Sequence, residues 1–375
     1  MIRIVIGGDL CPTEANSHLF ERGDAATLFG DLLPEFQNAD LSIVNLECPL
    51  IRKPSPIEKI GPILGAKDSC INAIRQAGTD VLNIANNHIM DHGSEGLSNT
   101  LKICKKSGIE LVGAGENLDA ARKILIKEVN KIRVGILSMA EHEFSIATET
   151  GWGAAPLDAI DFVRSVREHR SEYDYLIVLV HGGNEGYPYP RPSLMKTCRF
   201  FAEQGANAVI CQHSHCAGCY ESYRNGHIVY GQGNLLFEPK TQMARSWYEG
   251  FLVALEVDQD CKSRMEVIPY AQSDPEPGVR RIRGTKEKEF LSLLAARSKS
   301  LLDQDFVARQ WEIFCGQRSL QYLKLLYGNE SVLQRAVNKF RFSLRLYSRD
   351  SMMRRLNLVR CESHREILMK VLASM

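Results

Sequence analysis

Residues that can bind metal ions follow five short apolar runs of this chain. A single Asp, Asn or His after a strand is more often a helix cap, a turn former or a hydrogen-bonded core residue. Five strand ends that agree are hard to explain in that way, and imidazole with carboxylate suits one or two divalent ions of manganese, zinc or iron. The residues, in chain order, are Asp9, Asn45, Glu47, Asn86, Asn87, His88, Asp91, His181, Glu185, His213 and His215.

Short runs rich in Val, Ile and Leu alternate with helix-like stretches through the first 270 residues. Such runs are typical of buried strands, and the alternation predicts an α/β core. In an open α/β sheet the carboxyl ends of the strands meet at one edge, which would bring the polar residues together. The expected strands are 2–8, 41–45, 81–84, 109–112, 132–137, 175–180 and 208–211, and the expected helices are 68–76, 93–107, 158–170 and 193–204.

The pattern changes after residue 219. Segments 220–224 and 227–230 flank Asn225-Gly226, which suits a type I′ hairpin turn. Segments 251–257 and 264–270 form a second expected strand pair. The later part of the core is therefore expected to be antiparallel.

The polar motifs, taken in order, resemble the CapA family, the bacterial capsule and poly-γ-glutamate synthesis proteins related to calcineurin-like metallophosphatases. Each motif is weak by itself, and the ordered set over roughly residues 1–270 carries the resemblance. It implies a metallophosphatase-like four-layer α/β/β/α sandwich with a metal centre at the strand ends. The motifs are Gly8-Asp9, Asn45-Leu46-Glu47, Asn86-Asn87-His88-x-x-Asp91-x-Gly93, His181-x-Gly183-x-Glu185, His213-x-His215 and Gly231-x-Gly233-Asn234.

The resemblance also implies roles for these residues. His88 would protonate the leaving group, and Asp91 would orient its imidazole. Glu47 would be the bridging acid of the metal centre, and Asn45 and Asn234 are expected near the substrate. The implied metal ligands are Asp9, Glu47, Asn87, His181, His213 and His215.

Two positions depart from the metallophosphatase pattern. Cys11 stands where the first motif usually has His, so it is either a soft ligand or a buried structural residue. Gln212 replaces the Gly that usually precedes the last pair of histidines. These differences leave open whether the site holds one metal ion or two.

A Pro-rich loop after the fourth run supplies two further candidates for substrate binding. Glu185 and Arg191 lie in it, and Arg suits a carboxylate or a phosphate. The alternative is a surface loop that proline merely stiffens.

Two functions fit this pattern. The first is a metal-dependent hydrolase that acts on a phosphoester or on a γ-glutamyl or capsule-related polymer. The alternative is a non-hydrolytic component of capsular poly-γ-glutamate or polysaccharide synthesis, with protein partners in a biosynthetic complex and a metal site that binds polymer or is structural.

The charge of the chain is distributed unevenly. The 375 residues have a net charge of +1, which argues against a dedicated nucleic-acid binder. Residues 280–375 hold 20 basic and 9 acidic residues, and residues 1–279 hold 26 and 36, so the two parts carry +11 and −10. The loop-like composition of 272–278 separates them. We expect a metallophosphatase-like domain over 1–272 and a helical C-terminal region over 285–375, whose basic residues include Arg335, Lys339, Arg341 and Arg345.

No secretory signal pattern and no apolar run long enough to span a membrane occurs in the sequence. The expected location is therefore the cytoplasm. The odd number of cysteines, 11, and the absence of repeated metal-site spacing fit that expectation.

Overall fold

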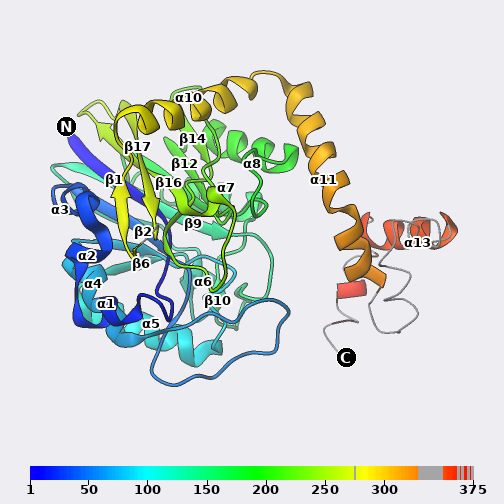
Figure 1. The fold of residues 1–375 in the computed structure, drawn as a ribbon, viewed down its shortest axis with the longest axis horizontal. Coiled ribbons are helices and arrows are strands. Elements are labelled where there is room, and N and C mark those ends of the chain that lie inside the picture. The colour runs from blue at the N-terminus through cyan, green and yellow to red at the C-terminus, as the bar shows by residue number, and fades with distance from the viewer. Residues whose placement is uncertain (274–275, 328–348, 361–363, 365–366, 370–371, 373–375) are drawn as a thin grey trace. The chain divides into compact units, whose positions relative to one another are not determined.

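A computed structural model describes residues 1–273, 276–327, 349–360, 364, 367–369 and 372 (Figure 1). The chain divides into two compact units, Met1–Gln310 and Trp311–Met375. The predicted boundaries after residue 272 and before residue 285 stay a prediction. The basic residues between 335 and 345 lie outside the described part of the chain.

Two β-sheets form the centre of the first unit. The first sheet has the strand order β18-β17-β16-β1-β2-β5-β6, with β15 also paired to β1, and the second has the order β13-β14-β12-β11-β9-β8. The strands of the first sheet are β1 (Ile2–Cys11), β2 (Leu41–Leu46), β5 (Val81–Asn83), β6 (Glu110–Val112), β15 (Asn234–Phe237), β16 (Glu249–Val257), β17 (Ser263–Gln272) and β18 (Val279–Arg281). Those of the second are β8 (Leu125–Val129), β9 (Ile132–Ala140), β11 (Tyr175–His181), β12 (Ala208–Gln212), β13 (Tyr220–Tyr223) and β14 (Gly226–Tyr230).

Short elements complete the first unit. Two small strand pairs, β3 with β4 and β7 with β10, lie outside the main sheets. Their bounds are β3 (Leu50–Ile51), β4 (Ala66–Lys67), β7 (Ala114–Gly115) and β10 (Gly153–Ala154). The helices are α1 (Ser17–Arg22), α2 (Ala25–Phe29), α3 (Leu33–Gln37), α4 (Ile71–Gln76), α5 (Gly93–Ser107), α6 (Leu118–Ala121), α7 (Ala159–Glu168), α8 (Pro192–Glu203), α9 (Arg245–Tyr248) and α10 (Gly284–Ser300).

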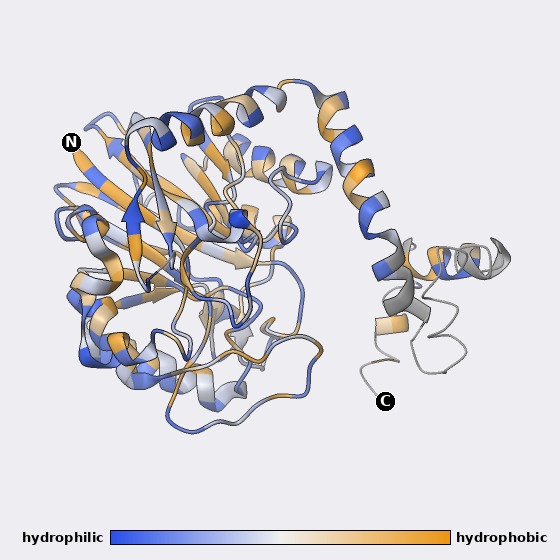
Figure 2. Ribbon diagram, in the orientation of Figure 1, coloured by the Kyte–Doolittle hydropathy of each residue, from blue (hydrophilic) through white to orange (hydrophobic). Residues whose placement is uncertain are grey.

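Alternate residues of each strand pack into different hydrophobic cores, because successive side chains point to opposite faces of a sheet. Ile4 and Ile6 of β1 pack with Ile177 of β11 in a core between the two sheets. Val5 packs in a second core with residues of α1 to α5. Val178 packs in a third core with residues of α7 and α8. Figure 2 shows the predominantly apolar strands. The predicted α/β class and its four layers are therefore confirmed.

The predicted hairpin is present, but its turn was placed one residue too far along the chain. Tyr223 pairs with Gly226, so the two loop residues are Arg224 and Asn225, and Arg224 has a φ of 53°. Gly226 lies in β14, where an added Cβ would be 2.7 Å from the carbonyl oxygen of Asn207. This glycine therefore permits close backbone approach. β14 also pairs parallel with β12, so the prediction of an antiparallel later core is wrong for that strand pair.

Helix α10 belongs to the first unit and packs on its core. Leu294 is 2% exposed in the core between the sheets, and Phe290 packs beside it with its ring 6.4 Å from that of Phe251. The guanidinium of Arg297 donates a hydrogen bond of 2.8 Å to the carbonyl oxygen of Ala217. Helix α11 (Gln304–Tyr327) begins in the first unit, and α13 (Arg349–Arg360) lies in the second. In the described residues, no helix has the length and apolar character needed to cross a membrane.

Leu294→Ala is expected to lower the free energy of unfolding by about 2–5 kcal/mol, because it opens a cavity in a packed core. Leu293→Ala is the matched control, since Leu293 is 53% exposed on the same helix, and it is expected to change stability by less than about 0.5 kcal/mol. Urea unfolding followed by circular dichroism measures both. Equal effects would show that α10 does not belong to the folded core.

Candidate metal centre

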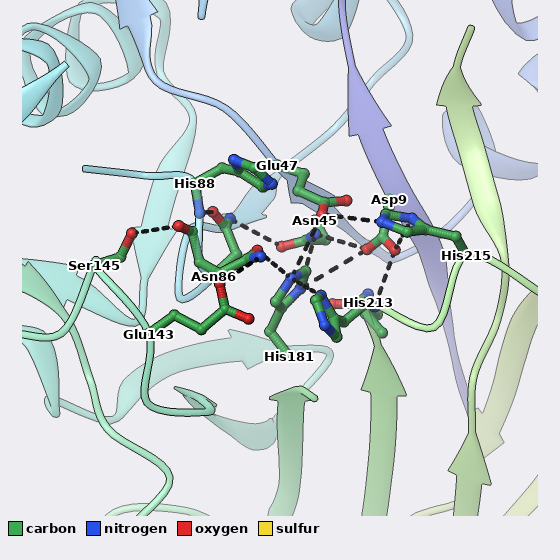
Figure 3. A network of polar contacts seen from close by, with 12 residues as sticks. Asp9, Asn45, Glu47, Asn86, His88, Glu143, Ser145, His181, His213 and His215 are labelled. Atoms are coloured by element: carbon green, nitrogen blue, oxygen red, sulfur yellow. Dashed lines mark hydrogen bonds and ion pairs between the residues drawn. The ribbon is translucent and has the colours of Figure 1, made fainter. Parts of the chain in front are cut away.

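The carboxyl ends of strands from both sheets meet at a cluster of buried polar side chains, which Figure 3 shows from close by. The first sheet contributes Asp9 from β1 and Glu47, which follows β2. The second contributes His181, the last residue of β11, and His213 and His215, which follow β12. All five side chains are buried. Residues far apart in the sequence are thus brought together where the two sheets meet.

These five residues form two groups that share Glu47. In each group one ligand atom per residue lies within 4.8 Å of the others, and the groups are Glu47 with His181 and His213, and Asp9 with Glu47 and His215. The Oε1 atom of Glu47 lies 3.6 Å from Nε2 of His181 and 3.6 Å from Nε2 of His215. Glu47 is therefore a carboxylate shared by two groups of residues that could each hold a metal ion.

The chemistry of Glu47 fits a cation. Its carboxylate is fully buried, and neither oxygen accepts a hydrogen bond from the described residues. Burial, and next the nearby charge of Asp9, raise the pKa of Glu47 well above its ordinary value. A buried carboxylate without hydrogen bonds is costly unless it is neutralised or coordinates a metal.

The histidines of the centre also fit this interpretation. Nε2 of His181 lies 3.0 Å from Oδ1 of Asn87 and 3.1 Å from Nδ1 of His213, so several lone-pair atoms face one another. Burial holds the pKa of His181 well below its ordinary value and lowers that of His213 to about 3. Neutral imidazoles are the form that binds metal. Burial also lowers the pKa of His215, so its contacts with Asp9 and Glu47 are not ion pairs of a charged imidazole.

Polar neighbours fix the orientation of two candidate ligands, Asp9 and Asn87. Asn45 donates from Nδ2 to Asp9 with a distance of 2.7 Å. Asn87 donates from Nδ2 to Glu143 at 3.2 Å, which leaves its Oδ1 directed at His181. Groups of this kind set the tautomer and direction of metal-binding side chains.

His215 is oriented in the same way. Its Nδ1 lies 2.8 Å from Oδ1 of Asn234, whose Nδ2 donates to the carbonyl oxygen of Trp247 at 3.2 Å. The indole of Trp247 also lies against the imidazole, with ring centroids 4.7 Å apart. Both contacts hold Nε2 of His215 toward Glu47.

Positive φ angles mark the segment that carries the last two histidines. His213 has a φ of 90° and His215 a φ of 51°. Residues other than Gly rarely adopt this region, and such conformations cluster at functional sites, where the surrounding structure holds them. The backbone after β12 therefore turns sharply to direct both imidazoles into the cluster.

His88 and Asp91 form a buried pair beside the cluster. Nδ1 of His88 lies 2.7 Å from Oδ2 of Asp91. Nζ of Lys59 lies 2.7 Å from the other carboxylate oxygen, and the side chains of Lys59 and Asp91 are 2% and 0% exposed. Because an ionised carboxylate only accepts hydrogen bonds, Nδ1 of His88 carries the proton and Nε2 is left for other contacts.

The remaining candidates from the sequence lie at different depths. Asn45 and Asn234 are fully buried against Asp9 and His215, where they support candidate ligands. Glu185 is exposed, and Arg191 donates to Glu141 at 2.7 Å. Their contacts with substrate stay predictions. Cys11 is buried and belongs to neither metal-type group in the described residues.

Sequence reasoning missed Lys59, Glu143 and Trp247. None follows a predicted strand directly, and none belongs to a recognised motif. Lys59 lies in the irregular segment between β3 and β4, Glu143 follows β9, and Trp247 lies in the short helix α9. A signal was present only for Glu143, since it comes shortly after an apolar run, as the other candidates do.

The fold and the cluster define a two-sheet α/β protein with a buried His, Asp and Glu centre of the kind that could bind metal ions. Residues 3–239 match the family described as "Bacterial capsule synthesis protein PGA_cap". The chain belongs to this family, which confirms the resemblance seen in the sequence.

Curated relatives are named for capsule biosynthesis or for PGA biosynthesis. The chain is 25% identical over 281 residues to "Capsule biosynthesis protein CapA" of Bacillus anthracis, which covers 72% of this chain and 68% of that protein. It is 26% identical over 296 residues to "PGA biosynthesis protein CapA" of Bacillus subtilis (strain 168), with 78% and 77% covered.

Among solved structures, a hypothetical protein from Thermus thermophilus matches at a TM-score of 0.44 with 14% identity, over 75% of this chain and 100% of that chain. The 5'-nucleotidase from Candida albicans matches at a TM-score of 0.39 with 12% identity, over 85% and 58%. Likenesses this weak carry no argument about activity.

Proposed function

We propose that this chain is a metal-dependent hydrolase that acts on a phosphoester or on a γ-glutamyl bond of a capsule-related polymer. The observation that carries the proposal is the unsatisfied carboxylate of Glu47 at the junction of two ligand groups. A carboxylate with both oxygens buried and without hydrogen bonds is expected to bridge cations.

The proposed ligands are the six predicted from the sequence: Asp9, Glu47, Asn87, His181, His213 and His215. A set of imidazole and oxygen ligands suits manganese, zinc or iron in the divalent state. When bound, such ions supply Lewis-acid polarisation of the scissile group and an activated water.

The chain's own groups supply the proton. His88 acts as an imidazolium with both ring nitrogens protonated. It donates the Nε2 proton to the leaving group and is left neutral, with the Nδ1 proton held by Asp91. Asn45 and Asn234 stay in place as supports of the ligands, and Arg191 and Glu185 are proposed to contact the substrate at the rim. This proposed contact of Arg191 and Glu185 with the substrate is supported by their position on the loop that follows His181.

The second candidate function is a polymer-binding component without hydrolytic activity. The names of the curated relatives, which concern biosynthesis, favour it. In this case the same centre holds metal that binds the polymer or fixes the sheets, and protein partners of a biosynthetic complex carry out the chemistry.

A substrate panel separates the two candidates. Purified protein is loaded with Mn²⁺, Zn²⁺ or Fe²⁺ and tested on a dinucleotide phosphodiester, γ-glutamyl p-nitroanilide and poly-γ-glutamate. Turnover of one class that a chelator removes and the metal restores is the expected result. Metal binding without turnover of any of the three contradicts the hydrolase, and calorimetric titration with poly-γ-glutamate then tests the binding component.

A further inference from the structure

The segment between β3 and β4, residues 52–65, is a long loop without helix or strand (Figure 1). Hydrogen bonds hold it against the segment that contains His88, Asp91 and His92. The amide of Ser55 donates to Nδ1 of His92 at 2.9 Å, and the amide of Ile57 donates to the carbonyl oxygen of Asp91 at 3.0 Å. The amide of Leu64 donates to the Asp91 carboxylate at 2.7 Å. We call this segment the strap.

Lys59 is the one residue of the strap that brings a cation to the buried His88–Asp91 pair in the described structure. Its side chain is 2% exposed, and Nζ lies 2.7 Å from Oδ1 of Asp91 and 3.4 Å from Nδ1 of His88. Nζ also lies 5.7 Å from the ring centroid of Phe144, which is 51% exposed above it. A lysine this deeply buried is rare unless it is paired.

The two oxygens of Asp91 have separate partners. Oδ1 accepts from Lys59, and Oδ2 accepts from His88 and from the amide of Leu64. The strap therefore supplies two of the three donors that hold this carboxylate. Without Lys59 the carboxylate would be a buried anion without its cation and would be free to rotate or to seek water.

We propose that Lys59 is a positioning residue, and that the strap assembles the proton donor by fixing the carboxylate of Asp91 against Nδ1 of His88. This inference rests on the proposed function, in which His88 is the acid. Its consequence is that the direction of Nε2 toward the substrate depends on an irregular segment of the chain as well as on the sheets.

Lys59→Met tests the proposal, because it keeps most of the length of the side chain and removes the ammonium. With the substrate turned over most rapidly in the panel, kcat is expected to fall by about tenfold. This loss is smaller than the roughly 10²–10⁴-fold contribution of a general acid, because His88 itself is still present. KM is expected to change by less than about twofold, since ground-state binding is not touched. Lys59→Arg restores most of kcat.

Lys53→Met is the matched control, because Lys53 is an exposed lysine of the same strap and is expected to leave kcat unchanged. Lys59→Gln keeps a hydrogen-bond donor without the charge, so its kcat is expected to lie between those of the wild type and Lys59→Met. It serves as the second variant if Lys59→Met does not fold.

A double-mutant cycle shows whether Lys59 acts through Asp91. In an Asp91→Asn background, Lys59→Met is expected to have no further effect on kcat, since the two residues act as one unit. A further drop of the full tenfold in this background, or an unchanged kcat in the single variant, would overturn the proposal.

The tautomer of His88 gives a readout that needs no turnover. Nitrogen-15 chemical shifts of the His88 ring in metal-loaded protein are expected to show Nδ1 protonated in both the neutral and the imidazolium form, and Lys59→Met is expected to mix in a neutral form protonated only on Nε2. An unchanged spectrum overturns the role of Lys59. If no substrate is turned over while the spectrum changes as expected, the proposed hydrolase is wrong and the positioning by Lys59 stands.

Discussion

Glu47→Gln is expected to remove metal from both ligand groups of the proposed centre. Glu47 belongs to both ligand groups, and its Oε1 lies 3.6 Å from a ring nitrogen of His181 and 3.6 Å from one of His215. Metal affinity should fall by more than about 100-fold, because changing a residue that only supports a ligand already costs about 10–100-fold. Metal content by mass spectrometry after dialysis, together with calorimetric titration, measures the loss.

Variants that lose a residue of only one of the two groups test this prediction further. His213→Ala and His215→Ala each remove a residue of only one group, so each is expected to weaken one ion more than the other. The matched control is Glu149→Gln, at an exposed glutamate, which should bind metal as the wild type does. Full metal content in Glu47→Gln would show that Glu47 is not a ligand.

The same substitution has a different effect without metal. Burial raises the pKa of Glu47 in the folded protein, so the unfolded chain releases this proton first, and the metal-free protein loses stability as the pH rises above 4.5. Glu47→Gln has no such charge, so its metal-free stability relative to the wild type should increase as the pH rises. Thermal unfolding in chelator at several pH values measures the difference.

His88→Ala is expected to lower kcat by about 10²–10⁴-fold while the metal content stays unchanged, because it removes the proton donor and no ligand. Steady-state kinetics with the substrate found in the panel and metal analysis of the same preparation give both values. The loss should be smaller for a substrate whose leaving group needs no proton, such as p-nitrophenolate.

The control for this variant is His18→Ala, at an exposed histidine of α1. Asp91→Asn should reproduce much of the loss in kcat, since it removes the acceptor that sets the tautomer of His88. Unchanged turnover in His88→Ala, with metal bound, would mean that another group protonates the leaving group.

The strands that carry the centre could be predicted because buried strands are continuous apolar runs, and the residue at which each run ends is visible. Helix 93–107 was predicted with the bounds that the structure shows. We could also predict that Asp9, Glu47 and the three histidines lie close together, because the carboxyl ends of strands converge at one edge of a sheet. The family match over residues 3–239 then confirmed the resemblance that the ordered motifs indicated.

Other features depend on contacts that leave no local pattern. Lys59 has the sequence context of an ordinary polar loop residue, and only the folded strap buries it against Asp91. The turn before β14 was misplaced because the close approach of Gly226 to Asn207 is a tertiary contact. Asn234 was expected near the substrate, and its contact with His215 depends on the pairing of β15 with β1.

The ligands of the centre come from two different sheets, Asp9 and Glu47 from one and the three histidines from the other. The spacing of the ligands is thus set by how the two sheets slide and tilt against each other. Conservative substitutions in the apolar layer between the sheets, for example at Ile6 or Ile177, are therefore expected to change the distances between the candidate ligands, although these residues do not contact the centre. Conversely, an ion bound at the centre would link the two sheets. The stability of the sheet-to-sheet packing would then depend on whether metal is bound.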